Sequence, residues 1–331
     1  MNEEYKDRLR TDAAAGNRFA ERLLLLALLS ENNVDSLGAV LEQVESMRGS
    51  VERLLLQAEL ACFHRYRAAD SWQLMLRECC ESGHPEARFI ASLYHDWSGL
   101  SDFAEGATEL SWSDGWDRWV VPVWHTVVEA GGVVVQRSER FAPAALVGLL
   151  RAELEPQLQA SSVINPQSGK PMAHPIRVNR CAQWFPEQLG WVGKLLECRL
   201  AEAAAYQTSC GEVLTMLHYQ KGHEYKPHVD CLSPQQAQSD EGKMQGGQRM
   251  MTVLFALGDD DVVGGETAFT ELAVEVKAPS GTLIKFNNVG IAGEPLRASL
   301  HEGRAVQQGE KWMLSKWVRE QPTPYGREVN L

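Results

Sequence analysis

The chain has 331 residues, of which 44% are hydrophobic and 23% charged, and this length and composition predict a globular protein of about two domains. Its formal net charge of -12 argues against a nucleic-acid partner, because proteins that bind the phosphate backbone normally carry a basic stripe and this sequence shows none. A neutral or basic peptide, or a small molecule, is easier to reconcile with this charge.

The first 30 residues predict a cytoplasmic protein without a membrane anchor. They are too charged for a secretory signal peptide, and their apolar run is too short to cross a bilayer. The seven cysteines are odd in number and lack the close pairs that are typical of zinc sites. We therefore expect reduced thiols, as in most cytosolic proteins.

Residues 17–100 show apolar side chains at spacings of three and four, which is the pattern of amphipathic helices. Short polar breaks divide these helices, and one break ends at Pro85, which is suited to the first turn of the next helix. The pattern predicts an all-α N-terminal domain over residues 1–110. A small helical bundle is favoured over a peptide-binding repeat array, because no repeat recurs at a fixed period.

A tryptophan-rich connection follows over residues 111–132. Its four tryptophans could form a recognition surface, but large aromatic side chains more often pack at a domain interface, and we favour that interpretation. They are Trp112, Trp116, Trp119 and Trp124. Gly131 and Gly132 mark the expected start of the second domain, residues 133–331.

The second domain opens with a first strand at residues 133–137 and a helix within residues 141–158. A polar, proline-rich loop at residues 164–184 leads to a strand near Arg180, and a second helix follows at residues 192–205. After Gly211 the sequence changes to short apolar runs separated by turn residues, which predicts an all-β region that closes into a double-stranded β-helix, or jelly roll. The expected fold class is therefore α+β. A polar stretch at residues 233–247 interrupts the strands and is expected to form a flexible lid.

Three side chains are predicted to bind one metal ion. His228 and Asp230 are two residues apart, so on an extended strand both point to the same side and can bind one ion. His301 can supply the third ligand. Two imidazoles and one carboxylate form the facial set that holds non-haem Fe(II) and leaves coordination positions open.

Lys311 stands ten residues after His301. A neighbouring strand could hold its ammonium group near the metal. There it would be suited to anchoring the distant carboxylate of a chelating keto acid.

Five sequence blocks now point to a known family. In order, they read YQKGHEYKPHVD, GGQRMMTVLFAL, GGETAF, PSGTLIKFNN and SLHEGRAVQQGEKWMLSKWVRE. From about Val133 to Arg319 the chain resembles the prolyl 4-hydroxylase branch of the Fe(II)/2-oxoglutarate dioxygenases. The resemblance implies a jelly-roll catalytic domain, Fe(II) as cofactor, and 2-oxoglutarate and O2 as co-substrates, with ascorbate as an optional further cofactor.

The resemblance also assigns roles to residues. It implies that Lys311 binds the C5 carboxylate of 2-oxoglutarate, with Thr267 and Tyr219 as hydroxyl partners. It further implies that Tyr225, Arg249 and Trp317 contact the substrate peptide. In the family, the loop that corresponds to residues 164–184 folds over the peptide, and its sequence here is divergent.

Three functions remain open at this point. The first is hydroxylation of a prolyl or similar residue in a peptide or protein, and we favour it because the peptide-contacting positions match. The second is hydroxylation of a free amino acid or small metabolite, which the divergent loop would allow. The third is a non-catalytic jelly-roll binding protein that uses its aromatic residues.

Overall fold

The computed structural model describes residues 72–93, 122–142, 144–164, 171–173, 176–185, 190–258 and 261–329, and the single positions 7, 10, 11, 55 and 58. The chain divides into two compact units. Unit 1 comprises Met1–Arg118, Phe185–Glu197 and Leu331, and unit 2 comprises Trp119–Trp184 and Cys198–Asn330. Among the described residues, no helix combines the length and the apolar character needed to cross a membrane.

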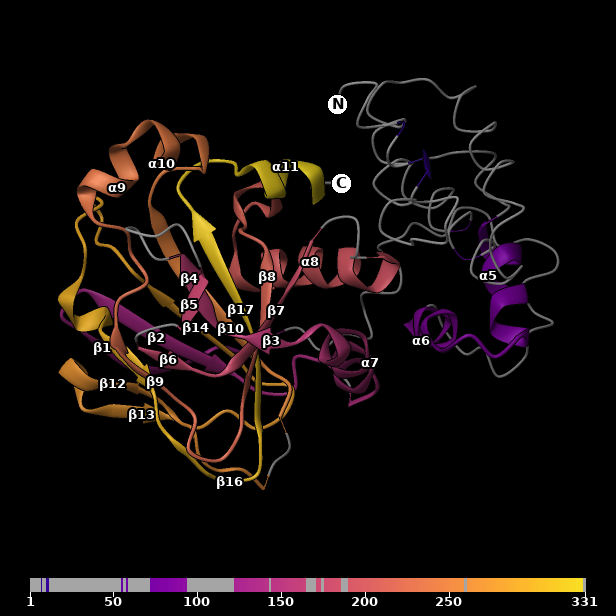
Figure 1. The fold of residues 1–331 in the computed structure, drawn as a ribbon, viewed down its shortest axis with the longest axis horizontal. Helices are drawn as coiled ribbons and strands as arrows, with labels where there is room; N and C mark the ends of the chain where they lie inside the picture. Colours follow the sequence, from indigo (N-terminus) through magenta and orange to yellow (C-terminus); the bar gives the residue numbers. More distant parts are fainter. Residues whose placement is uncertain are drawn as a thin grey trace. The chain divides into compact units, whose positions relative to one another are not determined.

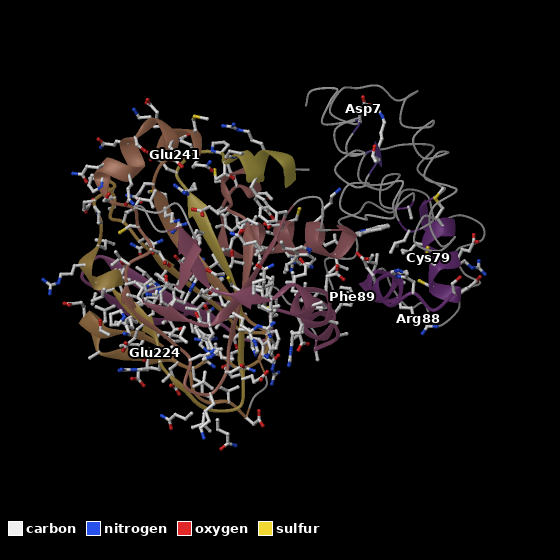
Figure 2. The ribbon with its side chains drawn as sticks, in the orientation of Figure 1. Asp7, Cys79, Arg88, Phe89, Glu224 and Glu241 are labelled. Carbon is white, nitrogen blue, oxygen red and sulfur yellow. The ribbon has the colours of Figure 1, made fainter. Side chains whose placement is uncertain are left out.

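In unit 1 the structure describes two helices that contact each other, α5 (Trp72–Glu81) and α6 (Pro85–Leu93). As the sequence predicts, α6 begins at its proline. Cys79 on α5 is fully buried, and burial raises the pKa of its thiol to about 12, so this cysteine is unreactive. Figure 2 labels Cys79 together with Arg88 and Phe89 of α6. Most of the expected all-α domain of residues 1–110 lies outside the described residues, and that domain remains a prediction.

Unit 2 is built on an eight-stranded antiparallel sheet, the major sheet, whose strand order is β1-β2-β14-β10-β17-β8-β7-β3 (Figure 1). Its strands are β1 (His125–Ala130), β2 (Val133–Ser138), β3 (Gln159–Ala160), β7 (Arg180–Trp184), β8 (Leu214–Tyr219), β10 (Arg249–Ala256), β14 (Leu283–Asn287) and β17 (Lys311–Arg319). The apolar runs of the sequence form these strands, because β-branched and aromatic side chains pack well on a pleated surface. Strand β2 is the one predicted as first, and β1 precedes it at the sheet edge.

A five-stranded antiparallel sheet, the minor sheet, has the order β13-β12-β15-β9-β6. Its strands are β6 (Arg177–Val178), β9 (Glu224–His228), β12 (Thr267–Phe269), β13 (Val274–Val276) and β15 (His301–Gly303). One hydrophobic core cluster includes Tyr219, Leu254 and Phe286 of the major sheet and Phe269 and Val276 of the minor sheet. Two antiparallel sheets around a shared core fit the predicted jelly roll.

Two small sheets and several helices complete unit 2. Strand β11 (Val263–Gly264) pairs with β16 (Val306–Gln308), and β4 (Ser162–Ile164) pairs with β5 (Pro171–Ala173). The helices are α7 (Ala144–Leu154), α8 (Gly190–Ala204), which continues from unit 1, α9 (Pro234–Gln238), α10 (Asp240–Met244) and α11 (Pro324–Val329). The 3-10 turns are η3 (Glu155–Gln157), η5 (Thr208–Cys210), η6 (Thr270–Leu272) and η7 (Arg297–Ser299).

The polar stretch at residues 233–247 contains two short helices where the sequence predicts a flexible lid. The hydroxyl of Ser233 caps α9 by accepting a hydrogen bond from the backbone N–H of Gln236, and the backbone N–H of Ser233 donates to the side-chain oxygen of Gln236. The hydroxyl of Ser239 caps α10 by accepting from the backbone N–H of Gly242. Figure 2 labels Glu241, an exposed side chain of α10. These caps give the segment a defined backbone.

The tryptophan-rich connection is described only from residue 122 onward. Trp124 is half-buried within unit 2, where its ring nitrogen donates a hydrogen bond to the carbonyl of Ala203 at 3.0 Å. The ammonium of Lys285 lies 4.3 Å from its ring centre. Trp112, Trp116 and Trp119 lie outside the described residues, so the predicted interface role of the four tryptophans stays a prediction. The cysteines at positions 79, 80, 181, 198, 210 and 231 are free thiols, as expected.

Candidate active site

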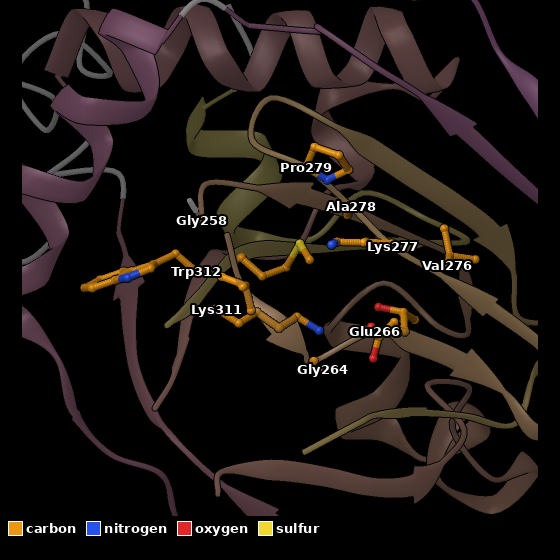
Figure 3. Close-up of a pocket in the computed structure, with 13 residues that line it drawn as sticks. Gly258, Gly264, Glu266, Val276, Lys277, Ala278, Pro279, Lys311 and Trp312 are labelled. Carbon is orange, nitrogen blue, oxygen red and sulfur yellow. The ribbon is translucent and has the colours of Figure 1, made fainter. Parts of the chain in front are cut away.

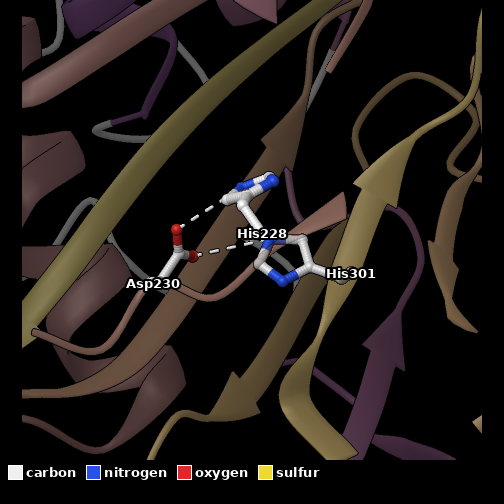
Figure 4. A group of neighbouring side chains, drawn as sticks. All are labelled: His228, Asp230 and His301. Atoms are coloured by element: carbon white, nitrogen blue, oxygen red, sulfur yellow. Dashed lines mark ion pairs between the residues drawn. The ribbon is translucent and has the colours of Figure 1, made fainter. Parts of the chain in front are cut away.

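The three predicted metal ligands meet between adjacent strands of the minor sheet. His228 is the last residue of β9, Asp230 follows two residues later, and His301 is the first residue of β15. The antiparallel pairing of β9 with β15 places His301 opposite His228. The potential ligand atoms of all three side chains lie within 4.8 Å of one another. Figure 4 shows the Asp230 carboxylate facing both imidazole rings, with each Nε2 at 3.6 Å from a carboxylate oxygen.

Backbone carbonyls orient both imidazole rings. Nδ1 of His228 lies 2.8 Å from the carbonyl oxygen of Lys226, and Nδ1 of His301 lies 2.9 Å from that of Ser299. Because a carbonyl only accepts hydrogen bonds, Nδ1 must carry the proton in each ring. This leaves Nε2 of each ring, which faces Asp230, as the atom that is available to a metal ion.

The protonation states of the cluster suit a cation. Burial, followed by the nearby His301, lowers the pKa of His228 to about 4, so its imidazole is neutral near pH 7. Burial acts to raise the pKa of Asp230, but the two histidines and the hydroxyl of Thr252 together hold it below its usual value. Two neutral imidazoles and one carboxylate are the donor set for which non-haem Fe(II) sites are known, and these residues fit that ion.

Two further side chains, which were not predicted from the sequence, support the carboxylate of Asp230, one directly and one through the other. Thr252 on β10 donates a hydrogen bond from its hydroxyl to Oδ2 of Asp230 at 2.7 Å. Asn288, just after β14, donates its side-chain amide to the Thr252 hydroxyl at 3.0 Å. Thr252 and Asn288 are completely buried. Such outer partners fix the direction of a ligating carboxylate.

We expect Thr252→Val to weaken divalent metal binding by about 10- to 100-fold, because the isosteric side chain removes the hydroxyl that orients Asp230. Equilibrium titration of the metal-free protein with Co2+, followed by absorbance, would measure this change. Thr252→Ser should retain most of the affinity, and Thr215→Val, at a buried threonine on β8, should match the wild-type protein. Equal metal affinity in Thr252→Val and the wild type would contradict the expectation.

Aromatic rings surround the histidines. The ring of Tyr225 stacks on His228 with 3.5 Å between ring centres. Phe286 and Phe269 lie 4.8 Å and 5.7 Å from the ring of His301. These rings exclude water from one side of the cluster, which strengthens electrostatic interactions there.

A cavity with an empty volume of about 470 Å3 is lined by His228, Asp230 and His301, the three candidate ligands that we call the metal cluster. All the predicted site residues except Arg249 line it, namely Tyr219, Tyr225, His228, Asp230, Thr267, His301, Lys311 and Trp317. Lys311 is the first residue of β17 and pairs in register with Tyr219 of β8, so its ammonium lies 5.5 Å from the Tyr219 ring centre. The ammonium of the half-buried Lys311 and two buried hydroxyl-bearing side chains, Tyr219 and Thr267, therefore share this cavity with the metal cluster.

Lys311 also borders a second cavity, of about 440 Å3, which we call the rear cavity (Figure 3). Glu266 and Lys277 line it as well. Burial lowers the pKa of Lys311 to about 8, although Glu266 acts in the opposite direction. Gly265 allows close packing here, because a Cβ atom at this position, where φ is +71°, would lie 3.3 Å from Cδ of Lys311.

Arg249 is occupied by an ion pair instead of lining the cavity. Its Nε and Nη2 donate hydrogen bonds to Glu212 at 2.6 Å and 2.9 Å, and its guanidinium lies 3.7 Å from the ring centre of Trp317. Arg319 donates to the same Glu212 carboxylate. Arg249 therefore supports Trp317, and its expected contact with substrate stays a prediction.

Comparisons with known proteins show what the region that carries this site is similar to. Residues 214–319 match the sequence model of the 2OG-Fe(II) oxygenase superfamily. Prolyl 4-hydroxylase 1 of Arabidopsis thaliana is 29% identical over 188 residues, which is 53% of this chain and 64% of that protein. Prolyl 4-hydroxylase subunit alpha-1 of Homo sapiens is 27% identical over 188 residues, which is 56% of this chain and 34% of that protein. The resemblance to the prolyl 4-hydroxylases is confirmed.

The chain thus spans less than two thirds of the length of either curated relative. Among solved structures, the viral collagen prolyl hydroxylase of Paramecium Bursaria Chlorella virus-1, in its 2OG complex, is similar over 56% of this chain and 94% of that one. The TM-score is 0.43 and the sequence identity is 20%. A prolyl hydroxylase of Trichoplax adhaerens, in complex with a hypoxia inducible factor peptide, gives a TM-score of 0.41 at 14% identity over 60% of this chain and 86% of that one.

Proposed function

We propose that this prolyl 4-hydroxylase-like chain is an Fe(II)- and 2-oxoglutarate-dependent oxygenase that hydroxylates a prolyl or similar residue in a peptide or protein. The observation that carries the proposal is the convergence of His228, Asp230 and His301 in one cavity that also contains the ammonium of Lys311. The superfamily match and the prolyl 4-hydroxylase relatives support it.

In this proposal, Nε2 of His228, Nε2 of His301 and the Asp230 carboxylate hold Fe(II). The bound metal would supply the oxidative chemistry in which O2 and 2-oxoglutarate are consumed, succinate and carbon dioxide are released, and a C–H bond is hydroxylated. The protein residues orient the reactants and exclude water, so their contribution is positioning.

Lys311 would pair with the C5 carboxylate of 2-oxoglutarate, and Tyr219 and Thr267 would donate hydrogen bonds to it. Burial raises the pKa of Tyr219, so its phenol keeps the proton that such a bond needs. The side chains of Tyr219 and Thr267 are each 4% exposed. Once 2-oxoglutarate fills the cavity, water can no longer reach their hydroxyl groups, and the C5 carboxylate would then be their hydrogen-bond acceptor.

Tyr225 and Trp317 line the cavity and are the proposed contacts of the substrate residue, since aromatic faces suit a proline ring. The prolyl substrate follows the relatives, which are prolyl 4-hydroxylases. Hydroxylation of a free amino acid and non-catalytic binding are not favoured by these relatives. A cytoplasmic location, ascorbate as a further cofactor, the absence of nucleic-acid and membrane partners, and the domain boundaries stay predictions.

The decisive experiment combines binding with turnover. Fe(II) and 2-oxoglutarate are added without oxygen, and the weak metal-to-ligand absorption band is recorded. Air and a proline-rich peptide are then admitted, and succinate is measured. Peptide-stimulated succinate would support the proposal, slow peptide-independent succinate would indicate a different substrate, and the absence of both the band and succinate would refute an oxygenase.

Co-substrate binding by Lys311 should depend on pH. Because the pKa of Lys311 is about 8, its ammonium is present below pH 8 and is lost above it. We therefore expect kcat/KM for 2-oxoglutarate to be level below pH 8 and to fall by up to about tenfold per pH unit above it. Lys311→Arg should keep its charge and give a flat profile to pH 10. A wild-type profile that is flat to pH 10 would contradict this expectation.

A further inference from the structure

Arg177 lines the cavity of the metal cluster, and within the part of the chain that the structure describes no carboxylate is paired with it. It belongs to β6, the edge strand of the minor sheet, and is half-buried. Its Nε is buried and makes no hydrogen bond. Burying a guanidinium donor without an acceptor is unfavourable, so this side chain indicates a ligand that supplies one.

The position of Arg177 is set by strand pairing. In the β6–β9 register, Arg177 stands opposite Tyr225, and its guanidinium lies 5.4 Å from the Tyr225 ring centre. Tyr225 in turn stacks on the proposed metal ligand His228. A group bound by Arg177 would thus be separated from the metal cluster by a single aromatic ring, on the side where Tyr225 is proposed to contact the substrate.

The carboxylates around this cavity already have other partners. Glu302 is paired with Arg304 at 2.7 Å, and Glu212, beside Trp317, is shared by Arg249 and Arg319. Asp230 belongs to the proposed metal site. An acidic group on the substrate would therefore meet at Arg177 a cation that no described carboxylate engages, although the whole chain carries a net charge of -12.

A purely structural role accounts less well for Arg177. A cation–π contact with Tyr225 does not provide an acceptor for the buried Nε–H of Arg177. Lys311 already provides a cation for the co-substrate. A carboxylate matches the fork of N–H donors that a guanidinium presents.

We propose that Arg177 is a specificity-determining residue that binds a carboxylate of the substrate, so that the preferred substrate carries an acidic group within about two residues of the hydroxylated carbon. This inference rests on the proposed function and names the substrate class for it. The carboxylate is either an Asp or Glu side chain of a peptide or the main-chain carboxylate of a free amino acid.

The test uses the full chain, loaded with Fe(II), and seven-residue peptides with a central proline. Each of the two positions on either side of the proline carries Asp in one peptide and Asn in its matched partner. Free proline and prolinamide form a separate pair. Succinate release gives kcat and KM, and fluorescence anisotropy of labelled peptides gives binding without turnover. The proteins compared are the wild type, Arg177→Gln, and the control Arg297→Gln, at an arginine whose side chain is 86% exposed.

The wild type should prefer one carboxylate-bearing member over its amide partner by about 10- to 100-fold in KM and in anisotropy, the range for a hydrogen bond between charged groups. Arg177→Gln should lose this preference with KM for 2-oxoglutarate unchanged, and Arg297→Gln should behave as the wild type. A preference for an Asp peptide identifies a peptide substrate, and a preference for proline over prolinamide identifies a free amino acid.

Three results would overturn the inference: no preference by the wild type in any pair, an undiminished preference in Arg177→Gln, or a rise in KM for 2-oxoglutarate instead of for the substrate. The first of these together with peptide-stimulated succinate would leave the proposed function intact. If no succinate forms and 2-oxoglutarate does not bind, the proposed function fails. Anisotropy then still decides whether Arg177 recognises a carboxylate.

Discussion

Asp230→Ala is expected to abolish Fe(II)-dependent turnover, because it removes the only carboxylate of the proposed metal site among the described residues that cluster there. Loss of an outer partner of a metal ligand weakens metal binding by about 10- to 100-fold, and loss of the ligand itself should exceed about 100-fold. The two histidines, held by backbone carbonyls, would remain in place. Titration with Co2+ and the rise in Tm on metal addition would both measure the loss.

The matched control for this variant is Asp240→Ala, at an exposed carboxylate in the first turn of α10. It removes the same charge from the protein without touching the cluster. It should retain metal affinity and 2-oxoglutarate binding. If Asp230→Ala binds Co2+ as tightly as this control, Asp230 is not a metal ligand, and the cluster would have to be explained as a buried ion pair.

The sequence was sufficient to predict the features that depend on local pattern. The apolar runs after Gly211 became strands β8, β10, β12, β13, β14, β16 and β17, because a strand that is buried on one or both faces needs such residues wherever it lies in the sheet. The two-residue spacing of His228 and Asp230 also needs no knowledge of distant segments. The meeting of these residues with His301 was inferred from chemistry, and the β9–β15 register brings them together.

Other features that depend on the pairing of distant segments were not predicted. Strand β1 is largely exposed, so it lacks the apolar run that would distinguish it from a connection. Asn288 reaches Thr252 because β10 and β14 lie side by side, and Thr252 in turn contacts Asp230. A threonine inside the apolar run RMMTVLFAL was the available signal, since a buried polar side chain needs a partner. The cap of α9 could have been predicted, because Ser233 and Gln236 have the spacing of a capping box.

Lys311→Met is expected to weaken 2-oxoglutarate binding while leaving metal affinity unchanged. Removing one partner of a buried charge pair costs about 2–5 kcal/mol, which is about 30- to 4,000-fold in Kd. Methionine keeps most of the volume and the apolar stem, so cavity formation contributes little to the loss. Isothermal titration of the Co2+-loaded protein with 2-oxoglutarate would give the change in Kd directly.

Lys277→Met is the control, because it removes an exposed lysine that lines only the rear cavity. It should change the Kd for 2-oxoglutarate by less than about threefold, since the charge of an exposed lysine is screened by solvent and salt. An equal loss of affinity in both variants would mean that the two lysines attract 2-oxoglutarate only through their long-range electrostatic field. A large loss in Lys311→Met alone, with Co2+ affinity preserved, would separate co-substrate binding from metal binding and assign the two functions to different residues of one cavity.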